Sequence, residues 1–179
     1  MSTFINILTL SRIFLAALIF ILLMSPNGYF LALVLFFLAG ITDYFDGYFA
    51  RKYNATSQLG EILDPIADKI LILFVLFGLA INLSSYLIGF IGATIITREI
   101  WVGALRDLNA RNGNNDATKV TFLAKIKTTI QLFTISIYLF GLAINNMLII
   151  VIADVFLFIS LFITLYTGLI YSLNSFKLK

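Results

Sequence analysis

Residues 43–69 read DYFDGYFARKYNATSQLGEILDPIADK, and they place four aspartates in a chain that is otherwise mostly apolar. Asp43 and Asp46 are three positions apart, and Asp64 and Asp68 are four apart, so two helices would each present two carboxylates on one face. Negative charges that face one another repel and are costly near lipid, and a bound cation relieves both penalties. Because the chain contains no histidine and no cysteine, its oxygen ligands predict a hard divalent ion, magnesium or manganese.

The composition is typical of a polytopic membrane protein. Hydrophobic residues make up 61% of the 179 residues, charged residues make up 12%, and the mean hydropathy is +1.03, which is outside the range of soluble domains. At about 20 residues per spanning helix, we expect an all-α fold of six transmembrane helices in a single membrane-embedded domain, residues 1–179. Arg12 lies within the first apolar stretch, which has no small-residue cleavage site, so we expect a retained helix rather than a signal peptide.

Polar and turn-forming residues divide the chain into six apolar segments. Ser25-Pro26-Asn27-Gly28 is a strong helix breaker, and Asn145-Asn146 is a weaker one. The predicted helices cover residues 5–24, 29–52, 60–81, 85–106, 118–142 and 148–173.

The basic residues gather at one side of this arrangement. The connections 25–28, 82–84 and 143–147 carry no charge. The basic residues lie on or near the other two connections and the C-terminal end: Arg51, Lys52, Arg106, Arg111, Lys119, Lys125, Lys127, Lys177 and Lys179. By the positive-inside rule, both termini are cytoplasmic. The four aspartates then lie in the cytoplasmic halves of the second and third helices, so we expect a site that faces the cytosol.

The aspartates belong to a longer spaced pattern, Asp43-x2-Asp46-Gly47-x2-Ala50-Arg51-x8-Gly60-x3-Asp64-x3-Asp68. It resembles the signature of the CDP-alcohol phosphotransferase family, also called CDP-alcohol phosphatidyltransferases, at all eight fixed positions. The resemblance extends to Asn6–Arg12 and Leu63–Lys69. Thr97–Ile100, Gly103–Arg106 and Lys125–Gln131 are similar to the bacterial branch of the family that uses glycerol 3-phosphate, whereas the sixth predicted helix carries no recognisable motif.

The resemblance implies a reaction in which the hydroxyl of glycerol 3-phosphate attacks the lipid-side phosphate of CDP-diacylglycerol and CMP leaves. It implies two Mg²⁺ or Mn²⁺ ions held by Asp43, Asp46, Asp64 and Asp68, with Asp68 also acting as the general base. Two such ions, about 3.5–4 Å apart, would bridge the diphosphate oxygens and stabilise the leaving phosphate. It further implies a homodimer that meets through helices three and four, surrounded by membrane lipid in a bacterial inner membrane, with no nucleic-acid partner.

By the same resemblance, the CDP-lipid is expected to bind Thr9, Arg12, Gly47, Ala50, Arg51 and Gly60. Gly47 and Ala50 are small enough to let the nucleotide approach the backbone, although helix packing explains them as well. Arg51 either pairs with the diphosphate or anchors its helix at the membrane interface. Arg12 either contacts the nucleotide or pairs with a carboxylate inside the membrane. Gly40, in the same helix as Gly47, is expected to serve helix packing.

A dianionic acceptor phosphate needs cations beside the aspartates, and arginine suits it because the guanidinium binds phosphate through two parallel hydrogen bonds. The candidates are Arg98, Arg106, Lys125 and Lys127. Arg98 lies within a helix and needs a partner there, either a phosphate or the neighbouring Glu99. The alternative for the two lysines is that they only extend to the interface. Residues 107–116 are predicted to form a solvated turn, and Asp154 has no assigned role.

Two other interpretations stay open. Intramembrane acids and bases are also typical of small ion-coupled transporters, but the chain shows no inverted repeat and its acids lie toward one face of the membrane rather than at the midplane. Within the family, the acceptor could instead be phosphatidylglycerol, inositol phosphate, serine or choline.

Overall fold

The computed structural model describes residues 2–53, 58–119 and 121–176, and this part of the chain is all-helical. Six α-helices and two short 3₁₀ helices follow in chain order: α1 (Ser2–Leu22), η1 (Pro26–Gly28), α2 (Tyr29–Tyr53), α3 (Gln58–Asn82), α4 (Tyr86–Arg111), η2 (Asn115–Thr118), α5 (Phe122–Ala143) and α6 (Met147–Phe176). The prediction of six helices is confirmed. The side chains of Asp46, Ala50 and Arg51 lie outside the described part, so their predicted roles stay predictions.

The connection between α4 and α5 differs from the prediction. The predicted turn at 107–116 is wrong for residues 107–111, because α4 continues to Arg111, and α5 begins only at Phe122. Arg111 pairs with Asp107 one turn earlier at 2.8 Å, and the buried Asn109 donates a hydrogen bond to Ser175 Oγ of α6 at 2.8 Å. These polar residues are therefore a helical extension beyond the apolar part of α4.

Three helices end in the same hydrogen-bonded turn. After α3, α4 and α5 the chain passes through Ser84, Gly113 and Asn145, whose φ angles are 48°, 70° and 52°. In each turn the following N–H reaches a carbonyl five residues back, as in a Schellman motif. These bonds join Ser85 to Ala80, Asn114 to Asn109 and Asn146 to Gly141 at 2.8–2.9 Å. The turns satisfy helix-end carbonyls that would otherwise lack partners at a membrane boundary.

The turn between α1 and α2 requires a glycine. A Cβ atom on Gly28 would lie 2.3 Å from the carbonyl oxygen of Leu22, a distance that only a backbone shift would relieve. Gly40 is different, because a Cβ atom there would have no described neighbour within 4 Å. Close packing within the chain therefore does not explain Gly40, contrary to the prediction.

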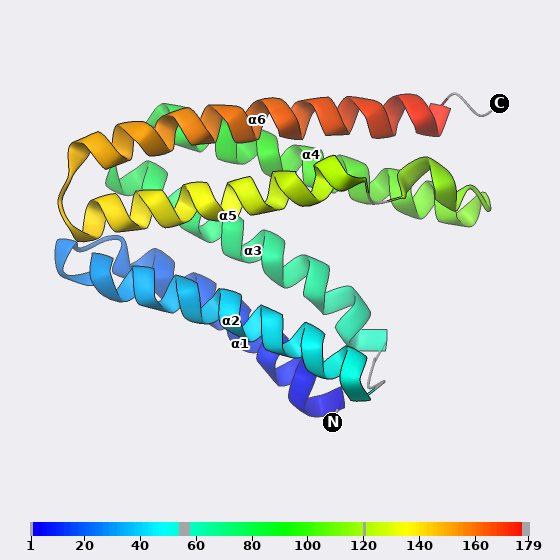
Figure 1. Ribbon diagram of the computed structural model, residues 1–179, viewed down its shortest axis with the longest axis horizontal. Helices are drawn as coiled ribbons and strands as arrows, with labels where there is room; N and C mark the ends of the chain where they lie inside the picture. The colour runs from blue at the N-terminus through cyan, green and yellow to red at the C-terminus, as the bar shows by residue number, and fades with distance from the viewer. Residues whose placement is uncertain (1, 54–57, 120, 177–179) are drawn as a thin grey trace.

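The helices run alternately up and down, so the start of α1, the end of α6 and the α4–α5 connection lie at the same end of the bundle (Figure 1). α1 packs against α2 and α3, and α6 packs against α4 and α5. α3 crosses between these two groups and contacts α4, while α2 contacts α5. The end of the bundle that holds the termini also holds the charged residues described below.

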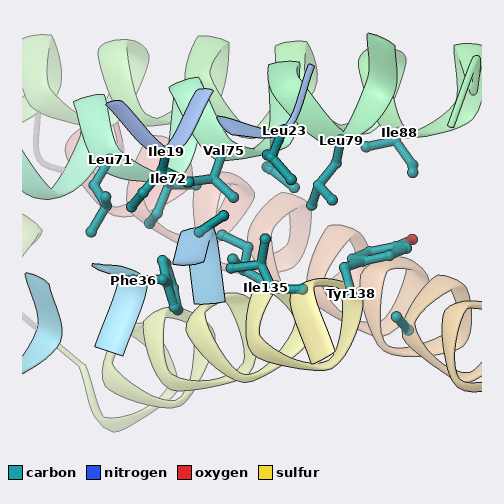
Figure 2. Close-up of a cluster of buried hydrophobic side chains, with 14 of the residues drawn as sticks. Ile19, Leu23, Phe36, Leu71, Ile72, Val75, Leu79, Ile88, Ile135 and Tyr138 are labelled. Carbon is teal, nitrogen blue, oxygen red and sulfur yellow. The ribbon is translucent and has the colours of Figure 1, made fainter. Parts of the chain in front are cut away.

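One apolar core joins the helices (Figure 2). It includes Ile19 and Leu23 of α1, Phe36 of α2, Leu71, Ile72, Val75 and Leu79 of α3, Ile88 of α4, and Ile135 and Tyr138 of α5. Tyr138 is fully buried, and its hydroxyl donates to Asp154 Oδ1 of α6 at 2.5 Å. Asp154 thus has a partner within the chain, which was not apparent from the sequence.

The outer surface and the helix lengths are those of a membrane protein. Four described segments are long and apolar enough to cross a bilayer: Pro26–Phe45, Tyr86–Arg111, Phe122–Ala143 and Met147–Phe176. α1 adds a shorter apolar segment, Asn6–Leu22. Large apolar side chains such as Phe30 and Phe162 are 68% and 70% exposed, as expected where the surrounding medium is lipid rather than water.

Gly28→Ala is predicted to destabilise the protein, because the new methyl group would collide with the Leu22 carbonyl. We expect the melting temperature in detergent to fall by about 5 °C or more. Gly40→Ala is the matched control, and it should leave the melting temperature unchanged or raise it slightly. Equal melting temperatures for the two variants would contradict the proposed role of Gly28.

Candidate active site

Three of the four aspartates meet around one buried arginine. Arg12 Nη1 donates to Asp43 Oδ1 of α2 and to Asp68 Oδ1 of α3, both at 2.5 Å, and its Nη2 lies 3.8 Å from Asp64 Oδ1. Thr9, one turn before Arg12, donates its hydroxyl to Asp64 Oδ1 at 2.7 Å. We call these five residues the acid cluster. Of the two roles considered for Arg12, the structure shows the pairing with carboxylates.

The acid cluster follows from helical spacing and from charge. Thr9 and Arg12 lie on one face of α1, and Asp64 and Asp68 lie on one face of α3, because residues three or four apart are neighbours on a helix. A guanidinium inside an apolar bundle needs carboxylate partners, since burying an unpaired charge is strongly unfavourable. Of the other residues predicted to bind the CDP-lipid, Gly47 is half-buried on α2, and Gly60 is buried near the start of α3.

The acid cluster fits a hard divalent ion. The Arg12 side chain is 1% exposed, whereas the side chains of Asp43, Asp64 and Asp68 are 51%, 45% and 47% exposed. The arginine is therefore buried, and the carboxylates around it are accessible to a ligand. Asp43 Oδ1 and Asp68 Oδ1 are no more than about 5 Å apart, since both lie 2.5 Å from one nitrogen. Mg²⁺ holds oxygens at about 2.0–2.1 Å, so one ion would need these two oxygens within about 4.2 Å of each other, and the limit of about 5 Å includes such separations.

Two of the predicted metal ligands, Asp43 and Asp68, thus share one hydrogen-bond donor, Arg12 Nη1. Among the described side chains, no group of three or more acids is arranged to hold a metal. Asp46, the fourth predicted ligand, has a side chain outside that set. The donor chemistry therefore suits the metal, and the complete ligand set stays a prediction.

A cavity of about 420 Å³ lies beside the acid cluster, between α3, α4 and α5. Its charged and amide side chains are Asp68 and Lys69 of α3, Arg98, Glu99 and Arg106 of α4, and Lys125, Lys127 and Gln131 of α5. We call this cavity the basic cleft, because five cations face two carboxylates in its lining. Its volume is typical of small-molecule sites. All four residues predicted to hold the acceptor phosphate line the basic cleft, and Asp68 belongs both to it and to the acid cluster.

Glu99 holds two of these cations together. Its Oε1 accepts a hydrogen bond from Arg98 Nη1 at 2.9 Å and also pairs with Lys127 Nζ. The side chains of Arg98 and Lys127 are 7% and 6% exposed. The suggestion that Lys127 extends to the interface is therefore wrong, whereas Lys125 is exposed.

Three cations of the basic cleft are available to an anion. Among the described side chains, no carboxylate forms an ion pair with Lys69, Arg106 or Lys125. An anionic ligand would offset the mutual repulsion of these cations. Because Asp68 is at the edge of the same cleft, an anion bound there would lie next to the acid cluster.

α6 contributes to the site, although no motif in its sequence predicted this. Arg98 Nε donates to the Thr164 carbonyl at 3.1 Å, and Arg98 Nη2 donates to Thr167 Oγ1 at 2.8 Å. The guanidinium groups of Arg98 and Arg106 lie 5.6 and 5.7 Å from the centre of the Tyr171 ring. A sequence signal was present, since Thr164, Thr167, Gly168 and Tyr171 recur at three- and four-residue spacing on an apolar helix.

Comparisons with known proteins agree with the family resemblance of the sequence. The family model of CDP-alcohol phosphatidyltransferase matches residues 3–167. The chain is 39% identical over 171 residues to a CDP-diacylglycerol–glycerol-3-phosphate 3-phosphatidyltransferase of Rickettsia bellii, covering 93% of this chain and 91% of that protein. Proteins of the same name are 37% identical in Wigglesworthia glossinidia brevipalpis, covering 72% and 71% of the two chains, and 33% identical in Escherichia coli K12, covering 73% of each.

Arg12→Gln is predicted to destabilise the acid cluster, because three carboxylates lose their shared counter-charge. We expect the melting temperature in the presence of EDTA to fall by about 5 °C or more, and Mg²⁺ to restore part of the loss by screening the same carboxylates. Arg111→Gln removes an exposed ion pair and should change the melting temperature by about 1 °C at most. An Arg12→Gln variant as stable as the wild type in EDTA would exclude this role.

Proposed function

Because the chain belongs to the CDP-alcohol phosphatidyltransferase family, we propose that it transfers the phosphatidyl group of CDP-diacylglycerol to glycerol 3-phosphate, giving phosphatidylglycerophosphate and CMP. Relatives at 33–39% identity that carry this activity in their names support the proposal. The observation that carries it is the position of Asp68, which pairs with Arg12 in the acid cluster and lines the basic cleft. This arrangement would bring a phosphate-bearing acceptor next to the reacting diphosphate.

The acid cluster is the proposed site for the diphosphate of the CDP-lipid. Enzymes of this family generally depend on a divalent metal, and Asp43, Asp46, Asp64 and Asp68 would hold it as Mg²⁺ or Mn²⁺. A bound divalent ion supplies charge neutralisation for the diphosphate and for the departing CMP. The nucleotide would lie against Thr9, Arg12, Gly47, Ala50, Arg51 and Gly60.

The basic cleft is the proposed site for the acceptor. Arg98, Arg106, Lys125 and Lys127 would hold its phosphate, and Lys69 adds a fifth positive charge. Asp68 would accept the proton of the acceptor hydroxyl as the hydroxyl oxygen bonds to the lipid-side phosphorus. The bond from that phosphorus to the oxygen shared with CMP breaks, and CMP leaves with that oxygen. Arg12 keeps Asp68 in place through its 2.5 Å hydrogen bond.

The charge of the basic cleft also discriminates between the acceptors considered. Five cations and two carboxylates line the basic cleft, so a dianionic phosphate is favoured, and the cation choline is repelled. Serine carries no net charge, so the basic cleft attracts it less strongly than it attracts glycerol 3-phosphate. Charge therefore favours glycerol 3-phosphate and inositol phosphate, which both carry a dianionic phosphate, over serine and choline.

The proposed setting is a bacterial inner membrane, crossed by all six helices, with both termini and the site toward the cytosol. The distribution of basic residues supports this orientation. We also propose a homodimer that meets through α3 and α4, an arrangement that rests on the family resemblance.

Purified protein in detergent with Mg²⁺ or Mn²⁺ is predicted to release CMP from CDP-diacylglycerol when glycerol 3-phosphate is present. Release should stop on addition of EDTA, because the diphosphate then lacks its counter-ions. Phosphatidylglycerol, inositol phosphate, serine and choline serve as competing acceptors, with lipid products identified by mass spectrometry. A product formed with one of these and none with glycerol 3-phosphate would overturn the assigned acceptor. Metal-dependent ion flux in liposomes without CMP release would instead favour a transporter.

Asp68→Asn is predicted to lower kcat by about 1,000-fold or more, because the amide cannot accept the hydroxyl proton. Binding of CDP-diacylglycerol, measured by calorimetry, should be largely retained, since the amide keeps the shape of the side chain. Asp107→Asn, which alters an exposed aspartate, is the control and should retain wild-type turnover. Substantial turnover by Asp68→Asn would remove Asp68 as the base.

A further inference from the structure

The face of α6 formed by Thr164, Thr167, Gly168 and Tyr171, which we call the α6 cradle, contacts the two arginines of the basic cleft. We propose that the α6 cradle sets the affinity for the acceptor phosphate by fixing Arg98 and Arg106, without touching the substrate. The cradle residues are therefore positioning residues. This inference rests on the proposed function, and it adds the element that determines how tightly the phosphate is held.

The bonds of Arg98 fix its guanidinium and still leave donors for a ligand. Nε donates to the Thr164 carbonyl, Nη2 donates to Thr167 Oγ1, and Nη1 donates to Glu99. The Thr167 hydroxyl donates in turn to the Ile163 carbonyl at 2.8 Å, so its oxygen is oriented to accept from Arg98. These bonds use three of the five N–H donors of a guanidinium. Two donors remain, and because Arg98 lines the basic cleft, we expect them to bind an anion there.

Gly168 makes room for Arg98. A Cβ atom at this position would lie 3.0 Å from Arg98 Cγ and 3.2 Å from Arg98 Nε. A side chain at this position would therefore require the stem of Arg98 to shift by a few tenths of an ångström. Because Gly168 has no side chain, the stem of Arg98 can occupy this space.

Tyr171 connects the arginines of α4 with the beginning of α5. Its ring lies within cation–π distance of both Arg98 and Arg106. Its hydroxyl accepts a hydrogen bond from the backbone N–H of Thr121 at 3.1 Å. Thr121 caps α5, since its Oγ1 accepts from the N–H of Ala124. One buried tyrosine thus links two arginines to the first turns of the helix that carries Lys125 and Lys127.

The competing explanation is that these polar residues only join α6 to its neighbours, as hydroxyl groups commonly do between membrane helices. The two explanations differ in the kinetic constants that they affect. A packing defect lowers stability or impairs both substrates together. A displaced arginine weakens binding of the phosphate-bearing acceptor while the CDP-lipid, held at the acid cluster, is bound as before.

The first test is Thr167→Val, which keeps the shape of the side chain and removes the acceptor for Arg98 Nη2. We expect the KM for glycerol 3-phosphate and the inhibition constant of inorganic phosphate to rise together about tenfold, the scale of one lost hydrogen bond to a charged group. The KM for CDP-diacylglycerol should be unchanged. Thr167→Ser, which retains the hydroxyl, should restore the wild-type values. Thr129→Val is the matched control, because Thr129 is exposed and bonds to the Lys125 carbonyl of its own helix.

A second pair of variants separates the ring of Tyr171 from its hydroxyl. Tyr171→Phe keeps the surface beneath both arginines and should raise the acceptor KM less than Tyr171→Leu, which removes it. Unchanged acceptor KM values in both Thr167→Val and Tyr171→Leu would overturn the inference. So would equal increases in KM for the two substrates.

The inference and the proposed function fail in different ways. A wild-type protein that makes no product from glycerol 3-phosphate would refute the proposed function. Calorimetry with inorganic phosphate then still tests the α6 cradle, because it requires no turnover. About tenfold weaker phosphate binding by Thr167→Val than by Thr129→Val would support the cradle, and equal binding would overturn it.

Discussion

The pairing of Arg12 with aspartates from two other helices is the interaction on which the rest of the site depends. A guanidinium that is 1% exposed between apolar helices is tolerated where carboxylates surround it, because an unpaired buried charge is strongly unfavourable. Asp43 lies on α2, whereas Asp64 and Asp68 lie on α3. The pairing of Arg12 with these carboxylates therefore holds α1, α2 and α3 together at one end of the bundle (Figure 1). The same contacts leave the three carboxylates about half exposed.

In the group formed by α4, α5 and α6, one partly buried carboxylate pairs with two cations, whereas at the acid cluster one cation pairs with several carboxylates. Glu99 is the anion that holds Arg98 and Lys127, and α6 supplies uncharged partners for the remaining guanidinium donors. Asp68 belongs to both halves, since it contacts Arg12 and lines the basic cleft. The two substrates of the proposed reaction would therefore meet at a residue located where α3 crosses between the two groups of helices.

Particular residues show which contacts could be predicted from the sequence and which could not. Glu99 was foreseeable as a partner of Arg98 because the two are adjacent in the chain, whereas Thr164 and Thr167 lie 66 and 69 positions away. Residues 107–111 have the composition of a loop, but they extend α4 because Asn109 bonds to Ser175 and Asp107 pairs with Arg111. Asp154 has no partner that the sequence pattern indicates, and in the structure it accepts a hydrogen bond from Tyr138. Apart from the Asp107–Arg111 pair, which is local to α4, the deciding contacts join residues of different helices, and their proximity depends on helix packing.

By itself, the sequence determined the helical class, the number and approximate limits of the helices, and the residue types of the site. Those features depend on local hydropathy, helix breakers and helical spacing, which act over a few turns. The tertiary structure alone decided that Arg12 lies beneath the aspartates, that Lys127 is paired while Lys125 is exposed, and that α6 supports Arg98. The physical reason is that a buried charge is satisfied by whichever groups helix packing brings within about 3 Å, and that distance is a property of the folded bundle.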